Sequence, residues 1–574
     1  MMALLVPLGL VAAATVTAAA TTPTTTSATS MFDLDSTPWD FEADPLDVGV
    51  AQKWFSTQAR PQLARNLTSP GAWQAQGVGN ETELEFHQYE GVGWYRKALA
   101  VGPIPKGSSV WIWIGGAPGG VMRSANVWAN GVHCGRHVGY LEPLEIELTA
   151  ALTSGGGKLV LAVAIDSRWN RTEDPLWGGG SMWNSGGPGS GGGAGAHVPT
   201  TPASGGDGYS FGGYGGMIGH ARLLVRQRAW IEDSVHITCT DAGGGAWQCA
   251  VKFALVGQVE AADRVSLAIC ECGGGSSGGG SSSNSSGAPA DCISGAQTAA
   301  NASRMMLTLT IPDAKLWAPG TQAAQAALYA ANLTLSLDGS GDQPPTTSST
   351  RFGVRSLSMD GPRILFNNEP LFLRGYGDDG QYGFTGAPPM DKGYYLSQLQ
   401  DMKSLGYNFI RFHTHSMPDV FHEAADELGF LCDPEFAMNY RYPCPFPGCV
   451  TTDQVHETFN RSFASIVQRT SHHPSLFGYV LSNEIGFGAD GAAAQAQFVE
   501  LYRFANINDP ERPCWTSDGA TGVGYNVTSL GCRNGETATD ASCFMDVWVP
   551  QSGWGHSEYA STFRASDPVL FSSA

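Results

Sequence analysis

The pattern of hydrophobic and polar residues divides the chain into three parts. In residues 31–227, short runs such as Ser109–Ile114 alternate apolar and polar residues and are separated by Gly and Pro. The pair Asn130 and Gly131 is a hairpin-turn signal. Many short strands with regular turns predict a β-sandwich or jelly roll. Gly-rich residues 173–218 interrupt it, either as a disordered insertion, which composition favours, or as a long loop with aromatic rings near a sugar site.

Residues 228–352 continue the β pattern and predict a second, smaller β-sandwich. Runs such as Trp247–Val256 and Leu328–Leu337 alternate in the way that half-buried strands do. The Gly/Ser tract Gly273–Ser286 lies between two such runs. Its composition predicts a flexible loop within this domain rather than a domain boundary.

From residue 353 onward, strand-like runs alternate with runs of helical periodicity, which is typical of a parallel α/β sheet. Seven such units predict a (β/α)8 barrel over residues 353–574, incomplete because no eighth unit follows. The predicted strands are 370–375, 408–413, 429–436, 476–484, 513–517, 545–549 and 568–571, and the predicted helices are 391–405, 419–428, 455–469, 492–506 and 558–564.

Polar residues gather where the predicted barrel strands end. One polar strand end could be a helix cap or a structural ion pair, but the strand ends of a barrel meet around one concave site. Five successive polar ends therefore predict a functional site at this edge. The residues are Arg374 with Asp378 and Asp379; Arg411, His413 and His415; Asp433 and Glu435; Asn483 and Glu484; Ser517 and Asp518.

The apolar run Leu476–Leu481 leads directly into Asn483 and Glu484, and this stretch organises the functional prediction. A glycosidase needs a carboxyl group that exchanges a proton with the glycosidic oxygen and a hydrogen-bonding neighbour for the sugar. We therefore predict Glu484 as a general acid/base and Asn483 as a substrate contact. The alternative is a carboxylate at a helix N-terminus beside a capping amide.

The other predicted substrate-binding residues are Arg411, His413, Glu435 and Asp379. Arg411 suits a bidentate pair that keeps a carboxylate anionic, and His413 suits a sugar hydroxyl. Glu435 either binds substrate or an ion, or pairs with Arg374 or Arg411.

Size and charge exclude some functions. A chain of 574 residues is expected to form about three domains. Its net charge of −20 argues against nucleic acid or an anionic membrane surface as a partner, because both need a basic face. No stretch qualifies as a good membrane span.

The N-terminus and the cysteines predict a secreted, extracellular or endomembrane-lumen protein. Residues 1–20 form an apolar run ending in small residues, as in a signal peptide, and residues 21–30 read as a Thr/Ser linker. Twelve cysteines, several closely spaced, suit disulfides; metal binding by Cys270 and Cys272 is the weaker alternative. Glycosylation signals occur at Asn66, Asn80, Asn170, Asn284, Asn301, Asn332, Asn460 and Asn526.

Four motifs resemble glycoside hydrolase family two, the family of β-galactosidases, β-glucuronidases and β-mannosidases. They are Gly91–Lys97, Val127–Gly131, Asn408–Gly429 and Leu481–Glu484, in the family's order and spacing over roughly 500 residues. The resemblance implies a jelly roll, an immunoglobulin-like β-sandwich and a TIM barrel that hydrolyses β-linked sugars with retention. It also implies Glu484 as the acid/base and Asn483 as a sugar contact. We predict no cofactor and no metal-ligating residue, and metal dependence does not follow from the sequence.

One departure from the family concerns the nucleophile, a Glu at the end of the seventh strand. Pro568–Ala574 resembles that strand, but Ser573 occupies the position. Either this sequence is incomplete or the nucleophile is missing; Glu558, in a motif resembling the nucleophile's, is a weaker candidate because it precedes a predicted helix. We therefore expect a retaining β-glycosidase, with a carbohydrate-binding pseudoenzyme as the alternative and a structural extracellular protein as a third hypothesis. The sugar and the oligomeric state do not follow from the sequence.

Overall fold

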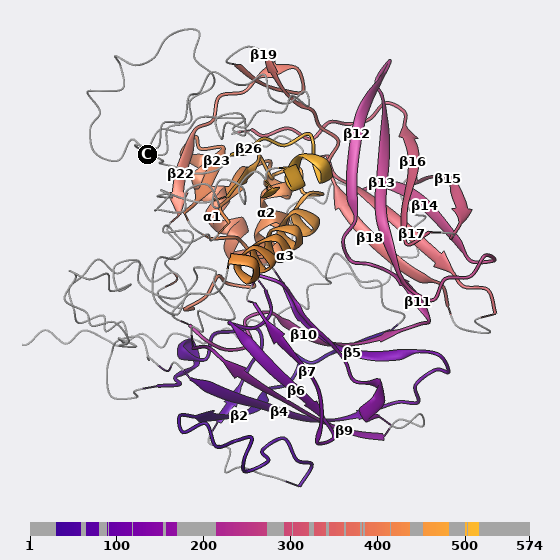
Figure 1. Cartoon of the computed structure of the whole chain (residues 1–574). Helices are drawn as coiled ribbons and strands as arrows, with labels where there is room; N and C mark the ends of the chain where they lie inside the picture. Colours follow the sequence, from indigo (N-terminus) through magenta and orange to yellow (C-terminus); the bar gives the residue numbers. More distant parts are fainter. Residues whose placement is uncertain are drawn as a thin grey trace, which may run out of the picture.

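The structure is a computed structural model, shown in Figure 1. The residues that it describes are 30–58, 65–79, 89, 91–116, 119–139, 141–152, 157–168, 214–272, 292–300, 302–320, 327–339, 344–360, 363–378, 382, 385–413, 415–436, 452–481, 500–501 and 503–515.

The first part of the chain is a sandwich of two antiparallel sheets. One sheet has the strand order β3-β2-β4-β9-β6-β7 and the other has the order β1-β10-β5-β8. Their facing sides enclose a core that includes Trp39, Tyr95 and Ile112. The strands are β1 (Ser30–Asp33), β2 (Trp39–Asp44), β3 (Arg65–Leu67), β4 (Val92–Val101), β5 (Ser109–Gly115), β6 (Ser124–Ala129), β7 (Val132–Val138), β8 (Leu144–Glu147), β9 (Gly157–Asp166) and β10 (His220–Arg226).

The hairpin predicted at Asn130 and Gly131 is confirmed. The two residues join β6 to β7 with φ angles of 50° and 83°. Positive φ at both central positions is the geometry that suits the twist of a two-residue hairpin, and Asn followed by Gly is the pair that adopts it most readily.

The second part is a smaller sandwich with its own core, which includes Trp247, Val265 and Leu333. One sheet has the order β11-β13-β12, with β16 also paired to β13, and the other has the order β15-β14-β17-β18. The strands are β11 (Ala229–Ile231), β12 (His236–Gly243), β13 (Ala246–Gly257), β14 (Arg264–Glu271), β15 (Cys292–Ala299), β16 (Arg304–Ile311), β17 (Tyr329–Ser336) and β18 (Thr346–Phe352).

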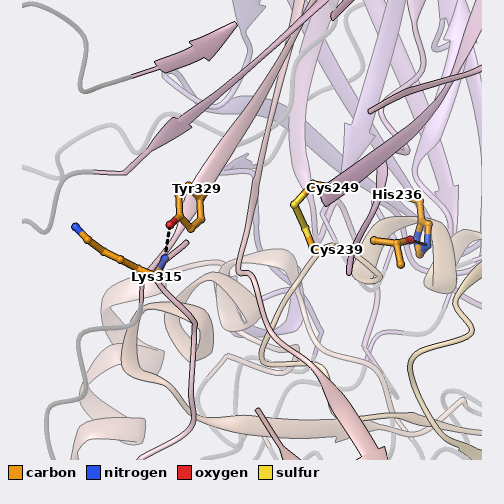
Figure 2. Close-up of a disulfide and its surroundings, with 6 residues drawn as sticks. His236, Cys239, Cys249, Lys315 and Tyr329 are labelled. Atoms are coloured by element: carbon orange, nitrogen blue, oxygen red, sulfur yellow. Dashed lines mark hydrogen bonds between the residues drawn. A yellow bond between two sulfur atoms is a disulfide. The ribbon is translucent and has the colours of Figure 1, made fainter. Parts of the chain in front are cut away.

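Two disulfides lie in the second sandwich. Cys239 and Cys249 face each other on β12 and β13, and Figure 2 shows the bond between their sulfur atoms. Their Cα atoms lie 4.1 Å apart. Cys270 and Cys292 face each other in the same way on β14 and β15. The first pairing matches the short spacing seen in the sequence. The second excludes a metal site built on the Cys270 thiolate.

The third part begins with a small antiparallel sheet and continues as parallel β/α structure. Strand β22 pairs with β23, β23 with β24, and β25 with β26, all in parallel. Two parallel bridges, Cys432 to Leu476 and Glu435 to Val480, join β24 to the β25 segment. The elements are β19 (Leu357–Asp360), β20 (Arg363–Phe366), β21 (Glu369–Pro370), β22 (Gly375–Asp378), β23 (Phe409–Phe412), β24 (Leu431–Pro434), β25 (Tyr479–Val480), β26 (Cys514–Trp515), α1 (Lys392–Ser404), α2 (Asp419–Leu428) and α3 (Thr452–Thr470).

Five parallel strands therefore follow one another in chain order, as in the first five units of a barrel. A closed ring is not seen in the described residues, and the predicted sixth and seventh strands lie outside them. The predicted first strand, residues 370–375, is wrong. Parallel pairing instead starts at Gly375, opposite Phe409, and Phe372 is 74% exposed.

The parallel strands present two different faces. Ile410 and Phe412 of β23 pack with α1 and α2. Phe409 and Leu431 belong to a separate cluster on the other face. Because successive side chains of a strand point to opposite faces, Arg411 points away from the helices, to the side that a barrel encloses.

The first sandwich shares a core with the β/α part. Met122 and Leu141 of the sandwich belong to one buried cluster with Phe463 of α3, Tyr479 of β25 and Leu481. Glu142 adds polar contacts to α3, because its Oε1 accepts hydrogen bonds from Ser462 Oγ at 2.6 Å and Arg461 Nε at 3.0 Å. Among the described helices, none is long and apolar enough to cross a membrane.

Candidate functional site

The carboxyl ends of β22, β23 and β24 bring five of the predicted polar residues to one edge of the sheet. We call Asp378, Arg411, His413, His415 and Glu435 the carboxyl-edge cluster. Parallel pairing explains why they meet, since strands running in the same direction end at the same edge. The backbone N–H of His413 donates to the carbonyl of Asp378 at 2.8 Å, which holds the first two strand ends together.

Arg411 and Glu435 form an ion pair at the centre of this cluster. Arg411 Nε donates to Glu435 Oε1 at 2.8 Å, and Arg411 Nη2 contacts the same oxygen. The Glu435 side chain is 0% exposed, whereas that of Arg411 is 17% exposed. A carboxylate buried this completely stays charged only beside a partner. Glu435 therefore fixes the guanidinium of Arg411. The sequence allowed either Arg374 or Arg411 as the partner of Glu435, and in the structure the partner is Arg411.

The two histidines of the cluster are coupled through the backbone. His415 Nδ1 lies 2.8 Å from the carbonyl oxygen of His413, so this nitrogen carries the proton. His415 Nε2 then points towards Asp378 Oδ1 at 3.8 Å and the Tyr382 hydroxyl at 3.5 Å. Burial raises the pKa of Tyr382 well above its ordinary value, so its hydroxyl stays protonated and can donate a hydrogen bond.

A buried network that the sequence did not predict holds β25 in place. Arg512 Nη1 donates to Asp509 Oδ2 at 2.6 Å, and the Tyr479 hydroxyl donates to the same oxygen at 2.7 Å. Arg512 Nε and Nη2 donate to the carbonyls of Leu476 at 3.0 Å and His473 at 2.7 Å. One guanidinium thus binds the segment just before β25, through the carbonyls of His473 and Leu476, and also β25 itself, through the Asp509 carboxylate that Tyr479 shares. This is the strand that leads to residues 483 and 484.

A second buried group lies beneath the sheet, between α2 and the segment before β25. The rings of His422 and His473 stack at 5.0 Å, and His473 Nδ1 donates to Asp426 Oδ2 at 2.6 Å. Burial lowers the pKa of His422 and of His473 to about 3, so both imidazoles are neutral at neutral pH. Burial also raises the pKa of Asp426 to about 6. None of these residues belongs to the carboxyl-edge cluster.

Five of the residues predicted at strand ends lie outside the described residues: Asp379, Asn483, Glu484, Ser517 and Asp518. The described segment 452–481 ends just after Val480, which forms a parallel bridge with Glu435 and whose carbonyl accepts a hydrogen bond from Phe436 N at 2.7 Å. The chain therefore leaves β25 at the level of Glu435.

Arg374, which was expected at a strand end, lies elsewhere. It precedes β22, and its Nε donates to the carbonyl of Gly406 at 2.7 Å, at the opposite end of the strand from Asp378. Within the described residues, no group of three His, Cys, Asp or Glu side chains is arranged to hold a metal ion.

The amino-acid sequence of the chain was compared with those of known proteins. No protein-family profile matches the chain. It is 23% identical over 488 residues to a β-glucuronidase of Paenibacillus borealis, covering 83% of this chain and 71% of that protein. It is also 23% identical over 231 residues to a β-galactosidase of Enterobacter cloacae, covering 40% of this chain and 21% of that protein.

Solved structures show the same fold. The β-glucuronidase of Parabacteroides merdae matches with a TM-score of 0.65 and 18% identity, covering 93% of this chain and 61% of that one. The β-glucuronidase of Ruminococcus gnavus in complex with D-glucuronic acid matches with a TM-score of 0.60 and 18% identity, covering 84% and 72%.

Proposed function

We propose, from the distant homology of this chain to the family-two β-glucuronidases and β-galactosidases, that it is a retaining β-glycosidase in which Glu484 is the general acid/base. The homology extends over most of the chain. The reaction, the residues that perform it and the sugar are our proposal.

One observation carries the proposal. Five parallel strands follow one another in chain order, and charged or imidazole side chains stand at the carboxyl ends of three of them. In β/α barrels this edge is where active sites are built. Strand β25 leads towards the same edge, and Asn483 and Glu484 come within four residues of its last residue, Val480.

Each residue of the proposed site has a chemical task. Glu484 protonates the leaving glycosidic oxygen and later removes a proton from the attacking water. Asn483 hydrogen-bonds to the sugar, and Arg411, held by Glu435, orients it with a fixed positive charge. His413 and Asp379 are proposed to contact sugar hydroxyls.

A retaining reaction also needs a second carboxylate about 5–5.5 Å from the first. Within the printed sequence Glu558 is the candidate for it, and Ser573 stands where the family's strand pattern would place a Glu. Both residues lie outside the described part of the chain.

For the sugar, we propose a β-glucuronide. The β-glucuronidase match covers 83% of this chain, against 40% for the β-galactosidase match. The R. gnavus enzyme holds D-glucuronic acid in its structure. A fixed guanidinium such as that of Arg411 is a suitable partner for a uronate carboxylate.

A panel of chromogenic β-glycosides tests the proposal. We expect the wild-type chain to cleave β-glucuronides and the Glu484→Gln variant to lose about 10²–10⁴-fold in rate, because an amide cannot supply a proton. The matched control is Glu457→Gln, which removes an exposed carboxylate of α3 and should leave the rate unchanged. Undiminished activity in Glu484→Gln would refute the acid/base role.

The second candidate is a carbohydrate-binding pseudoenzyme, favoured by Ser573 at the nucleophile position. It predicts sugar binding without turnover of any glycoside in the panel.

We also propose that the protein is secreted, and N-terminal sequencing of the mature protein tests this directly.

A further inference from the structure

A pocket of about 790 Å³ lies where the two sandwiches and the β/α part meet. Its walls come from β5 and β10 of the first sandwich, β11 and β13 of the second, and the helices α1, α2 and α3. We call it the interdomain pocket. No member of the carboxyl-edge cluster lines it, so the pocket is separate from that cluster.

The sandwich wall of this pocket is the outer face of one sheet. Ala221, Leu223 and Val225 of β10 point into the sandwich core. The alternate residues, Arg222 and Arg226, therefore point outward and line the pocket.

Strand β5 behaves in the same way. Trp111 and Trp113 alternate with the core residues Ile112 and Ile114. Arg222 and Trp113 are direct cross-strand partners, and Arg222 Cζ lies 5.2 Å from the Trp113 ring centroid.

Arg222 is a buried cation without an ionic partner. It is 8% exposed, and within the described part of the chain it makes no hydrogen bond and no ion pair. The carboxylates of Asp35, Asp33, Asp233 and Asp419 act on it only from beyond ion-pair distance, and Asp35 is already engaged by His220 at 2.7 Å. By contrast, Arg226 on the same strand pairs with Glu145 and lies over Trp111 and Trp230. A buried charge without a close ionic partner is unfavourable, so an anion that enters the pocket and contacts Arg222 would be stabilised there.

The helical wall offers further polar atoms. Asp419 Oδ1, Arg469 Nη1 and His472 Nδ1 are buried and have no hydrogen-bond partner among the described residues. Asp419 and Arg469 already pair with each other through their other atoms, at 2.8 Å. Burial lowers the pKa of His472 well below its ordinary value, so its ring is neutral. A mixture of donors and acceptors of this kind suits hydroxyl groups, each of which both donates and accepts.

We propose that the interdomain pocket binds an acidic saccharide, with its carboxylate against Arg222 and its hydroxyls towards Asp419, Arg469 and His472. Half-buried tryptophans supply the apolar surface that a sugar ring needs beside such polar groups. The volume lies within the range of small-molecule sites, about 300–1,000 Å³, and exceeds what a single inorganic anion fills. This binding site goes beyond the proposed catalytic function and does not depend on it.

Isothermal titration calorimetry on the full chain tests the proposal, with D-glucuronate, D-glucose and inorganic sulfate as probes. We expect D-glucuronate to bind and the Arg222→Gln variant to weaken one binding site by about ten-fold or more, the usual scale for a lost charge-assisted hydrogen bond. Arg304→Gln, which changes an exposed arginine of β16, is the matched control and should leave binding unchanged. Glycosidase activity should be the same in Arg222→Gln as in the wild type.

Three results would overturn the proposal: D-glucuronate binding that Arg222→Gln does not affect, D-glucose binding as tightly as D-glucuronate, or sulfate binding as tightly as D-glucuronate. The last would identify a simple anion site. A crystal of the unaltered chain soaked in D-glucuronate avoids any folding effect of the variant. Density in the pocket with its carboxylate on Arg222 supports the proposal, and density confined to other sites contradicts it. A failed glycoside panel would leave all these outcomes unchanged, so the two proposals are tested separately.

Discussion

Replacing Arg512 tests whether β25 depends on its buried guanidinium. The side chain is 5% exposed and makes three hydrogen bonds: one to the carboxylate of Asp509 and one each to the carbonyls of Leu476 and His473. In Arg512→Met the apolar bulk remains, but among the described residues the Asp509 carboxylate keeps only the hydroxyl of Tyr479 as a hydrogen-bond partner, with Arg355 acting on it at longer range. The variant therefore isolates the polar contribution of the guanidinium.

The expected cost follows from these contacts. Breaking a buried ion pair by removing one partner costs about 3–5 kcal/mol, because the remaining charge is left uncompensated. Loss of the hydrogen bond to the His473 carbonyl adds about 1 kcal/mol. The Leu476 carbonyl still accepts from Arg355 Nη2 at 3.1 Å, so it contributes little. We expect a total of about 4–6 kcal/mol, enough to unfold the β/α part locally.

Hydrogen exchange read by mass spectrometry is the appropriate assay, because a chain with several domains need not unfold in one step. Amides of β25 and of the segment before it should lose protection in Arg512→Met, while those of the second sandwich keep theirs. Arg304→Met, at an exposed position on β16, is the control. The double variant Arg512→Met/Asp509→Leu should recover much of the loss, since it removes the stranded charge. Unchanged protection around Tyr479 in the single variant would refute the reasoning.

Two further predictions concern buried charges. Glu435→Gln should lower the local stability of the β/α part by about 3–5 kcal/mol, since it removes an anionic partner of Arg411, and should also reduce glycosidase activity; unchanged hydrogen-exchange protection of β23 and β24 would contradict this. For His422, the folded pKa of about 3 lies below its ordinary value, so between pH 6.5 and 3 only the unfolded state takes up the proton. Stability should therefore fall on acidification, by about 2 kcal/mol at pH 5 from His422 alone. The loss of hydrogen-exchange protection in α2 between pH 7 and pH 5, corrected for the intrinsic exchange rates, should be smaller in His422→Gln than in the wild type, and an equal loss would count against the prediction.

Helix α2 shows how far the sequence pattern reaches. It runs from Asp419 to Leu428, as predicted, and ends at Gly429 with a φ of 64°. Apolar periodicity and a terminating glycine are local signals, so they predict the helix correctly even when the elements that pack against it are unknown.

The first parallel strand shows why a pattern can mislead. Leu371, Phe372 and Leu373 form an apolar run, but pairing with β23 starts at Gly375 and continues through Gly377. Glycine weakens a strand prediction because it has no side chain to pack. The backbone partner rather than the apolar run decided where the strand lies.

The sequence predicted which residues lie in the carboxyl-edge cluster, but not which of them pair with each other. Arg411 and Glu435 were both expected at strand ends, yet choosing between Arg374 and Arg411 as the partner required the register of β23 against β24. The Arg512 network was missed because its contacts cross from a loop to backbone carbonyls, which leave no periodic signal in the sequence.

The buried cluster that joins Met122 and Leu141 to Phe463 and Tyr479 has a consequence for how the molecule can be divided. A fragment beginning at residue 353 would lose the side chains of Met122 and Leu141, and also the Glu142 carboxylate that accepts hydrogen bonds from α3. It would expose apolar surface on α3, next to the strand that leads to Glu484. The N-terminal sandwich is thus a structural prerequisite of the β/α part, and the latter should aggregate or remain partly unfolded when it is produced alone.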